Sequence, residues 1–350
     1  MKATGTWVRW LAAAGTLLML TDVALAAAPM QRTQAPGYYR MMLGDFEVTV
    51  LSDGTLPFNV HELLTNITPA RLDAALARAF LKEPIDFSVN AFLVNTGSKL
   101  ALIDTGCGAA YGPGVGHLLQ SLRAAGYRPE QVDDIYITHM HGDHIGGLLQ
   151  DGKAAFPNAT VHAAQAEAGY WLSEAQMNAK PAAERDGFKA AMTLFKPYVA
   201  AQRFQTFSGN VELLPGIRAV AASGHTPGHT MYLVSSKNES LLLWGDLMHV
   251  AAAQFPDPAV TIRFDIDSPR AARARIAAFA DAAAKGYLVG GAHLSFPGLG
   301  HLRAAGPVSS GASNSKEAAG DAPLVSYAYV PVAYAVPAPP SSAPPSRSSH

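Results

Sequence analysis

THMHGDHIGG, residues 138–147, places three histidines and an aspartate within six consecutive positions. Side chains two apart in an extended segment point the same way, so His139 and His141 can bind one metal ion. Asp143, which is displaced by the turn that follows, and His144 then face a second ion. The stretch therefore predicts one short loop that serves two metals.

The other polar candidates also lie where predicted strands end. The loop follows a strand at 135–138, and further strands are predicted at 231–234, 241–244 and 287–289. Polar side chains stand beside these strands, at His225, His229, Asp246 and His293. Glycines and prolines near them let the backbone turn sharply and bring the side chains together.

Strand and helix signals alternate along the rest of the chain. Strands at 91–94 and 100–103 are predicted to pair as a hairpin. Ser268-Pro269 opens an alanine-rich helix that Gly286 closes. This alternation predicts a layered α/β domain.

The donor set favours a transition metal. Imidazole nitrogens with few carboxylates suit zinc, whereas calcium and magnesium prefer oxygen-rich sites. Zinc is the first choice for both ions, and manganese, iron and cobalt stay open.

The order of these motifs resembles that of the binuclear hydrolases of the metallo-β-lactamase superfamily. Five segments carry the resemblance, in this order along the chain: Asp104-Thr105-Gly106, HMHGDH at 139–144, Gly228-His229, Gly245-Asp246 and His293. The resemblance implies an αββα sandwich, in which two mixed sheets are flanked by helices and the metals lie at one edge between the sheets.

The same resemblance implies a ligand set. It assigns His139, His141 and His229 to one metal. It assigns Asp143, His144 and His293 to the other metal, and Asp246 bridges the two. His225 is then a group that fixes the loop rather than a ligand.

The charges in such a site imply a mechanism. Two divalent ions bring four positive charges, and the two expected catalytic residues, Asp143 and Asp246, return two negative ones. A water between the metals should therefore ionise near neutral pH. The metal-bridging hydroxide is the expected nucleophile toward the phosphorus or carbonyl carbon of a neutral ester.

Within the superfamily the chain resembles the branch that hydrolyses organophosphate triesters of the methyl parathion type. GYYR at 37–40 and HLSFPG at 293–298 are among the segments that carry this likeness. It implies a substrate pocket whose aromatic rim is formed by Tyr111, Trp171 and Phe188. Leu56, Phe58 and Phe264 are the expected apolar walls. His249 is expected in the pocket where that branch has an apolar residue. Such a pocket suits neutral esters with aryl groups.

The first expected function is thus that of a metal-dependent phosphotriesterase. A lactonase or arylesterase would use the same hydroxide and stays open. An iron-dependent oxidoreductase of the same superfamily and a noncatalytic metal-binding protein are the alternatives from other classes.

The composition limits the partners and the domains. The chain has 350 residues with 26 Lys+Arg and 27 Asp+Glu, a formal charge of -1, so no nucleic-acid partner is expected. With 49% hydrophobic residues it can build a sizeable core, and one hydrolase domain is predicted at 36–336. Ser, Gly and Ala at 306–322 predict a disordered insertion, and the Pro/Ser-rich stretch 337–350 predicts a disordered tail.

Residues 1–26 are typical of a secretory signal peptide, with a positive start, an apolar run and a small-residue cleavage site at Ala24-Leu25-Ala26. We therefore expect a periplasmic or secreted protein with no stable membrane association after cleavage. Its expected partner is a small neutral ester, and the superfamily resemblance is compatible with a homodimer.

Overall fold

The structure of this chain is a computed structural model in which residues 28, 30–308 and 324–335 are described. The described residues from Pro36 onward form one compact unit. The predicted signal peptide and the predicted tail at 337–350 lie outside the described residues. Within the described part, no helix has the length and apolarity that a membrane crossing requires.

Two mixed sheets, each of seven strands within the described residues, form the centre of this unit. The first sheet has the order β1 (Tyr38–Leu43), β2 (Phe46–Phe58), β4 (Ile85–Asn95), β5 (Leu100–Ile103), β6 (Asp134–Tyr136), β9 (Thr160–Ala164) and β10 (Phe204–Phe207). The second has the order β11 (Glu212–Leu214), β12 (Ile217–Ala221), β13 (Thr230–Ser236), β14 (Glu239–Leu243), β16 (Leu288–Gly290), β17 (Leu299–Pro307) and β18 (Val325–Pro331).

Parallel and antiparallel pairs are combined in each sheet. β5, β6, β9 and β10 run parallel, as do β14 and β16, and their neighbours are antiparallel. Two short pairs lie outside the large sheets: β3 (Leu64–Thr65) with β15 (Thr261–Ile262), and β7 (Leu149–Gln150) with β8 (Lys153–Ala154). The hairpin predicted from 91–94 and 100–103 is confirmed as the antiparallel pair β4–β5.

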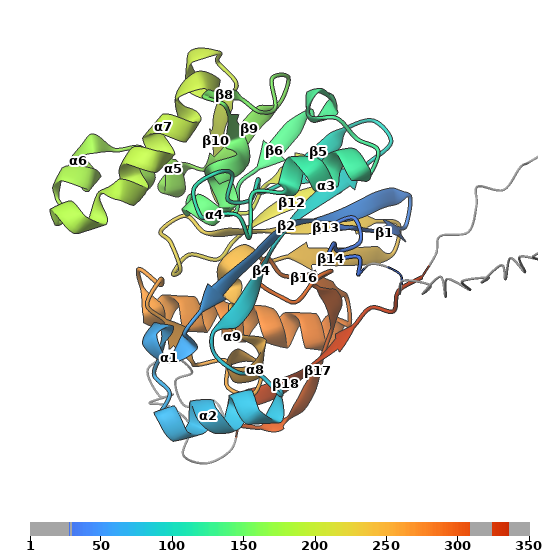
Figure 1. Ribbon diagram of the computed structural model, residues 1–350, viewed down its shortest axis with the longest axis vertical. Helices are drawn as coiled ribbons and strands as arrows, with labels where there is room; N and C mark the ends of the chain where they lie inside the picture. The colour runs from blue at the N-terminus through green and yellow to red at the C-terminus, as the bar shows by residue number, and fades with distance from the viewer. Residues whose placement is uncertain (1–27, 29, 309–323, 336–350) are drawn as a thin grey trace, which may run out of the picture. The chain divides into compact units, whose positions relative to one another are not determined.

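Helices cover the outer faces of both sheets (Figure 1). Their bounds are α1 Val60–Leu63, α2 Pro69–Arg78, α3 Leu118–Ala124, α4 Gly142–Ile145, α5 Gln165–Trp171, α6 Glu174–Asn178, α7 Asp186–Ala200, α8 Ala251–Gln254 and α9 Ser268–Lys285. α9 has the predicted ends: Asp267 accepts a hydrogen bond from the Arg270 amide, Pro269 lies in the first turn, and Gly286 ends the helix at φ 69°.

Three apolar cores separate the layers. One packs α3, α5 and α7 on the first sheet through Leu122 and Phe195. A second lies between the sheets, where Tyr136 meets Tyr232, and a third packs Phe279 of α9 on the second sheet. The αββα sandwich predicted from the sequence is therefore confirmed.

The first two residues of the predicted insertion at 306–322 belong to a strand. Gly306 and Pro307 belong to β17 and pair with Ser326 and Val325 of β18, because backbone pairing continues past the point where the composition changes. Residues 309–322 lie outside the described part.

Candidate metal centre and substrate pocket

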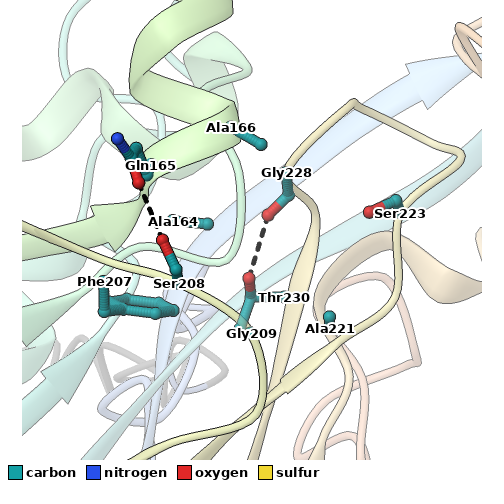
Figure 2. A pocket seen from close by; sticks show the side chains of 10 residues that line it. All are labelled: Ala164, Gln165, Ala166, Phe207, Ser208, Gly209, Ala221, Ser223, Gly228 and Thr230. Atoms are coloured by element: carbon teal, nitrogen blue, oxygen red, sulfur yellow. Dashed lines mark hydrogen bonds between the residues drawn. The ribbon is translucent and has the colours of Figure 1, made fainter.

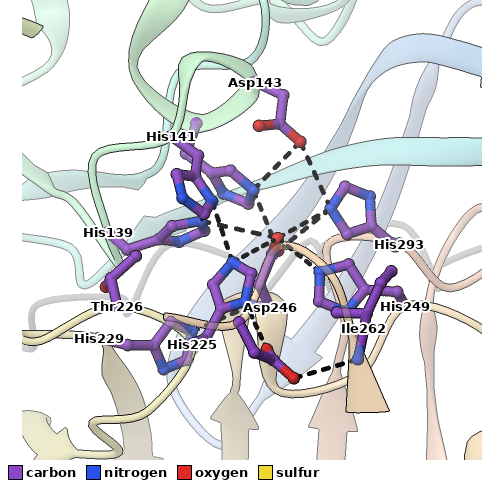
Figure 3. Close-up of polar contacts among 12 residues, drawn as sticks. His139, His141, Asp143, His225, Thr226, His229, Asp246, His249, Ile262 and His293 are labelled. Atoms are coloured by element: carbon purple, nitrogen blue, oxygen red, sulfur yellow. Dashed lines mark hydrogen bonds and ion pairs between the residues drawn. The ribbon is translucent and has the colours of Figure 1, made fainter. Parts of the chain in front are cut away.

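The candidate ligands meet at one edge of the sandwich, from segments that follow strands of both sheets. The segment after β6 supplies His139, His141, Asp143 and His144. The turn between β12 and β13 supplies His225, and Asp246 and His293 follow β14 and β16. Figure 3 shows His139, His141, Asp143, His225 and His293 gathered around the Asp246 carboxylate.

The local backbone explains why one loop reaches two places. The chain is extended up to His141 (φ -72°, ψ 153°) and turns into α4 at Gly142. His139 and His141 therefore precede the turn, while Asp143 and His144 lie inside it. This is the change of direction that the sequence predicted.

The ligand atoms form two groups that share Asp246. The first group is His139, His141, His225 and Asp246, and the second group is Asp143, His144, Asp246 and His293; within each, the ligand atoms lie within 4.8 Å of one another. Oδ1 of Asp246 lies 3.0 Å from Nε2 of His144, and Oδ2 lies 3.4 Å from Nε2 of His225 and 3.6 Å from Nε2 of His139. One carboxylate thus contacts both groups.

The polar atoms in these groups are better placed to bind divalent cations than to form hydrogen bonds with one another. Nε2 of His144 and Oδ1 of Asp246 are both buried, and although they lie 3.0 Å apart, neither makes a hydrogen bond within the described residues. Nδ1 of His141 lies 3.0 Å from Nε2 of both His139 and His225, a contact of three nitrogens that single protons cannot satisfy fully. Imidazoles with carboxylates are ligands of zinc and related ions, so the residues present fit a metal pair.

The structure differs from the sequence analysis at the histidine pair 225 and 229. His225 belongs to the first group, and His229 belongs to neither. The Asp246 amide donates a hydrogen bond to Nε2 of His229 (3.1 Å), and Nδ1 of His229 donates to the Ala222 carbonyl (3.2 Å). Because the backbone occupies both nitrogens of His229, the structure puts His225 where the sequence analysis put His229.

Hydrogen bonds from outside the groups fix three of the imidazole rings. The partners of Nδ1 are Oδ2 of Asp104 for His144 (2.8 Å), Oδ1 of Asp265 for His225 (2.9 Å) and the Ser88 carbonyl for His293 (2.8 Å). An Nδ1–H that donates outward leaves the Nε2 lone pair free to bind a metal. Sequence analysis missed Asp265 and Ser88, since neither stands in a motif with the ligands.

Burial and neighbouring charges set the protonation of the groups. Burial lowers the pKa of His139 and lowers the pKa of His141 to about 3, so both imidazoles stay neutral, as metal ligands must. Burial opposes the charged form of Asp246, but His144 and His293 hold its pKa well below the usual range. Burial also opposes protonation of His225, yet contacts with Asp246 and Asp265 raise its pKa to about 9.

A pocket of about 340 Å³ opens over both groups. All but one of the predicted pocket residues line it: Leu56, Phe58, Tyr111, Trp171, His249 and Phe264. Phe87 and Met140 also line it and were missed by the sequence analysis. The pocket therefore places apolar and aromatic walls directly above the candidate ligands.

Phe188 is the exception among the predicted pocket residues. It lies in α7, is 2% exposed, and its ring centroid lies 4.7 Å from that of Trp171. The face of α7 that carries Phe188 packs on the first sheet, so this ring supports Trp171 from behind instead of lining the pocket.

His249 brings a polar atom into the apolar pocket. Its Nε2 lies 3.0 Å from Oδ2 of Asp246, and its ring stacks on His293 at 5.3 Å. Burial lowers the pKa of His249, so the ring is neutral. Because a carboxylate only accepts, Nε2 carries the proton, and the buried Nδ1, which has no hydrogen-bond partner in the described residues, is an acceptor.

A second cavity of about 370 Å³ lies beside the start of α5 (Figure 2). Phe207, Gln165 and several small residues line it, and Ser208 donates a hydrogen bond to Oε1 of Gln165 (2.8 Å). None of the candidate ligands is among its lining residues. This cavity is therefore separate from the pocket over Asp246.

Comparison with known proteins agrees with this geometry. The family described as metallo-beta-lactamase superfamily matches residues 84–285. An N-acyl homoserine lactonase of Bacillus cereus is 26% identical over 124 residues, which cover 35% of this chain and 40% of that protein. The probable metallo-hydrolase Rv2300c of Mycobacterium tuberculosis is 28% identical over 180 residues, covering 46% and 56%. The chain spans about half the length of these curated relatives.

Solved structures match over more of their length. The hydrolase AbOPH, described as belonging to the beta lactamase superfamily, is 34% identical with a TM-score of 0.78, covering 87% of this chain and 100% of its own. AidC, a dizinc quorum-quenching lactonase in complex with the product N-hexanoyl-L-homoserine, is 27% identical with a TM-score of 0.74, covering 86% and 99%.

Proposed function

The chain belongs to the metallo-β-lactamase superfamily, and from this premise we propose that it is a two-metal hydrolase whose preferred substrates are lactones. The observation that carries the proposal is the apolar pocket that opens onto two ligand groups sharing Asp246. Hydrolysis by a metal enzyme follows from the family, and the substrate is the proposed step.

We assign one cation to the first group and one to the second group, with Asp246 in both. When bound, the cations supply a water that is nucleophilic at neutral pH and Lewis acidity toward the ester oxygen. Zinc suits the imidazole-rich groups, and AidC is a dizinc enzyme. Manganese, iron and cobalt are the alternatives that metal analysis would distinguish.

The chain's own residues orient the substrate. Leu56, Phe58 and Phe264 exclude water from an acyl chain or ring above the ligands. Nδ1 of His249 is an acceptor for an N–H or O–H of the substrate. An amide beside a lactone ring would supply such a donor while its acyl chain lies on the apolar walls.

The likeness to lactonases supports this ranking. AidC matches almost its whole length, and the Bacillus cereus relative is an N-acyl homoserine lactonase. The pocket combines a polar acceptor with apolar walls, which suits a compact polar ring that carries an apolar chain.

A phosphotriester or aryl ester is the second candidate, and the aromatic walls favour it. Phe58, Tyr111 and Trp171 offer flat surfaces to an aryl leaving group. Organophosphate triesters of the methyl parathion type were the first expectation from the sequence. The likeness to lactonases moves them to second place.

A substrate panel tests the ranking. The zinc-loaded chain is assayed on N-hexanoyl homoserine lactone, an aryl lactone, a nitrophenyl ester and a nitrophenyl dialkyl phosphotriester. We expect the highest kcat/KM on a lactone; a higher value on the phosphotriester would reverse the ranking. Two bound ions without turnover on any of the four would contradict a hydrolase, and bound iron with oxygen uptake would indicate an oxidoreductase.

We also propose export to the periplasm or beyond, on the signal-peptide pattern at 1–26. Cell fractionation and the N-terminal sequence of the mature chain test this, and an uncleaved chain in the cytoplasm would contradict it. Sedimentation of the purified protein decides whether it forms the homodimer that the superfamily resemblance allows.

A further inference from the structure

Glu167 is a buried carboxylate to which neither the sequence analysis nor the proposed function gives a role. It lies in α5 and is 1% exposed. Its Oε1 accepts a hydrogen bond from the Met140 amide (2.8 Å), and its Oε2 accepts from the Thr226 hydroxyl (2.7 Å) and the Gly228 amide (2.8 Å). Three donors thus converge on one side chain.

These donors stand beside ligands of the first group. Met140 lies between His139 and His141, and Thr226 follows His225. The first of these segments leaves the first sheet, and the other leaves the second sheet. The Glu167 carboxylate therefore joins the two loops that must approach each other to form the first group.

Position 228 must be glycine for the turn to contact Glu167 in this way. A Cβ atom at Gly228 would lie 2.3 Å from the amide nitrogen and 2.6 Å from the Cβ of Glu167, closer than side chains approach. Figure 2 shows Gly228 beside Ala166 at the start of α5. Glycine at 228 is what lets the loop reach Glu167.

The second group is held by other contacts. Asp104 binds His144, and the Ser88 carbonyl binds His293. The hydrogen bonds of Glu167 reach none of these residues. A change at Glu167 should therefore affect the first group more than the second.

We propose that Glu167 is a positioning residue for one metal of the pair: it holds the loops at 139–141 and 225–228 at the separation at which His139, His141 and His225 bind a single cation. This inference rests on the proposed two-metal function. Contacts that orient metal ligands from outside are commonly worth 10- to 100-fold in metal affinity, so the effect should be measurable.

Glu167→Gln tests the proposal with almost no change of volume. Glutamine has one acceptor oxygen and one NH2 donor. If its oxygen faces Thr226 and Gly228, its NH2 meets the Met140 amide, and the reverse orientation sets NH2 against the Gly228 amide. In either orientation one loop loses its acceptor. Glu174→Gln is the matched control, because it makes the same change at an exposed position on the neighbouring helix α6.

The readout is zinc affinity, measured by competition with a chromophoric chelator. The step that belongs to the first group is identified as the one lost in His225→Ala. We expect Glu167→Gln to weaken that step about 10- to 100-fold and to leave the other within about twofold. Glu174→Gln should match the unmodified chain in both steps.

Two results would overturn the inference. One is a Glu167→Gln protein that binds both ions as tightly as the unmodified chain; the other is equal weakening of both steps. An unmodified chain that binds fewer than two ions would instead overturn the proposed function, and that failure is visible before any variant is made. If Glu167→Gln does not fold, Thr226→Val, which removes one of the three donors, must weaken the same step by several-fold, and unchanged binding would reject the proposal.

Discussion

Nδ1 of His225 lies 2.9 Å from Oδ1 of Asp265. Because a carboxylate only accepts, His225 donates this hydrogen bond, and its Nε2 is turned toward Asp246, where a cation would displace the second proton of the ring. This contact selects His225 over His229, four residues later, as the histidine of the turn that faces the first group.

The two histidines should therefore behave differently on substitution. We expect His225→Ala to bind one zinc ion instead of two and to lose about 100-fold or more in turnover. His229→Gln should retain both ions and lose about 1–3 kcal/mol of folding stability, since its contacts are with backbone. Metal analysis and urea unfolding check both variants, and loss of an ion only in His229→Gln would restore the assignment made from the sequence.

Asp246→Asn should abolish turnover. The carboxylate contacts both groups, and an amide replaces one acceptor oxygen by a donor that cannot bind a cation. We expect a loss of at least about 100-fold in kcat together with the loss of one ion. Asp151→Asn, at an exposed loop position, is the control; rates in Asp246→Asn equal to those of this control would contradict the bridging role.

Gly142→Ala should alter the pocket through Tyr111. A Cβ atom at 142 would lie 2.2 Å from the Tyr111 hydroxyl oxygen, so the ring must move away from the ligands. Burial, followed by the nearby charge of Asp143, raises the pKa of Tyr111 to about 12, so the hydroxyl keeps its proton in any ordinary assay. We expect a several-fold change in KM with both ions retained.

The double variant shows whether the hydroxyl is the cause. In Tyr111→Phe the closest contact with a new Cβ would be the ring carbon Cε2 at 3.1 Å, so the added methyl group should disturb the pocket less. The effect of Gly142→Ala on KM should therefore shrink in the Tyr111→Phe background, and independent effects would refute the coupling.

His249→Leu should change substrate preference and keep the metals. His249 belongs to neither group and lines the pocket, and its Nδ1 is the acceptor that we propose for a substrate N–H or O–H. Losing one neutral hydrogen bond costs about 1 kcal/mol, so kcat/KM on an amide-bearing lactone should fall about fivefold to tenfold. An aryl phosphotriester offers no N–H and should lose nothing.

Both substrates must be measured on the same preparation, with the zinc content as the control. Equal losses on the two substrates would mean that His249 acts through Asp246 and not through the substrate. His249→Gln, which keeps a polar side chain, should lie between Leu and the unmodified chain.

The sequence was informative where chemistry requires a fixed spacing along the chain. HMHGDH at 139–144 and the order of the later motifs resemble the metallo-β-lactamase superfamily, and this resemblance predicted the sandwich and six residues that the structure brings together. The choice between His225 and His229 could not be made this way, because both follow a glycine and only contacts with Asp265 and Ala222 separate them.

Residues that act across the fold gave no signal at all. Glu167 is an ordinary glutamate in a short helix until α5 lies against the turn at 225–228. Phe188 was expected in the pocket from the resemblance to the phosphotriesterase branch, but its ring packs against Trp171 and does not line the pocket. The positions of these side chains depend on how distant elements pack, and a local sequence pattern does not specify that packing.

Arg275 is a further residue of this kind, and its replacement should destabilise the fold. It is fully buried in α9 and donates hydrogen bonds to the carbonyls of Leu247 (2.6 Å), Pro258 (2.9 Å) and Val260 (2.6 Å). Arg275→Met keeps much of the length and leaves the buried carbonyls of Leu247 and Pro258 without this donor, whereas Val260 keeps its hydrogen bond from Gln254. Each carbonyl left without a donor costs about 1–3 kcal/mol, so we expect a loss of about 2 kcal/mol or more in unfolding free energy.

Urea unfolding with and without zinc separates stability from metal binding. Because Leu247 follows Asp246, zinc should restore part of the lost stability by holding Asp246 in place. Arg270→Met, an exposed change on the same helix, should unfold within about 0.5 kcal/mol of the unmodified chain. If Arg275→Met unfolded at the same urea concentration as Arg270→Met, the three carbonyl contacts would not contribute to the stability of this edge of the sandwich.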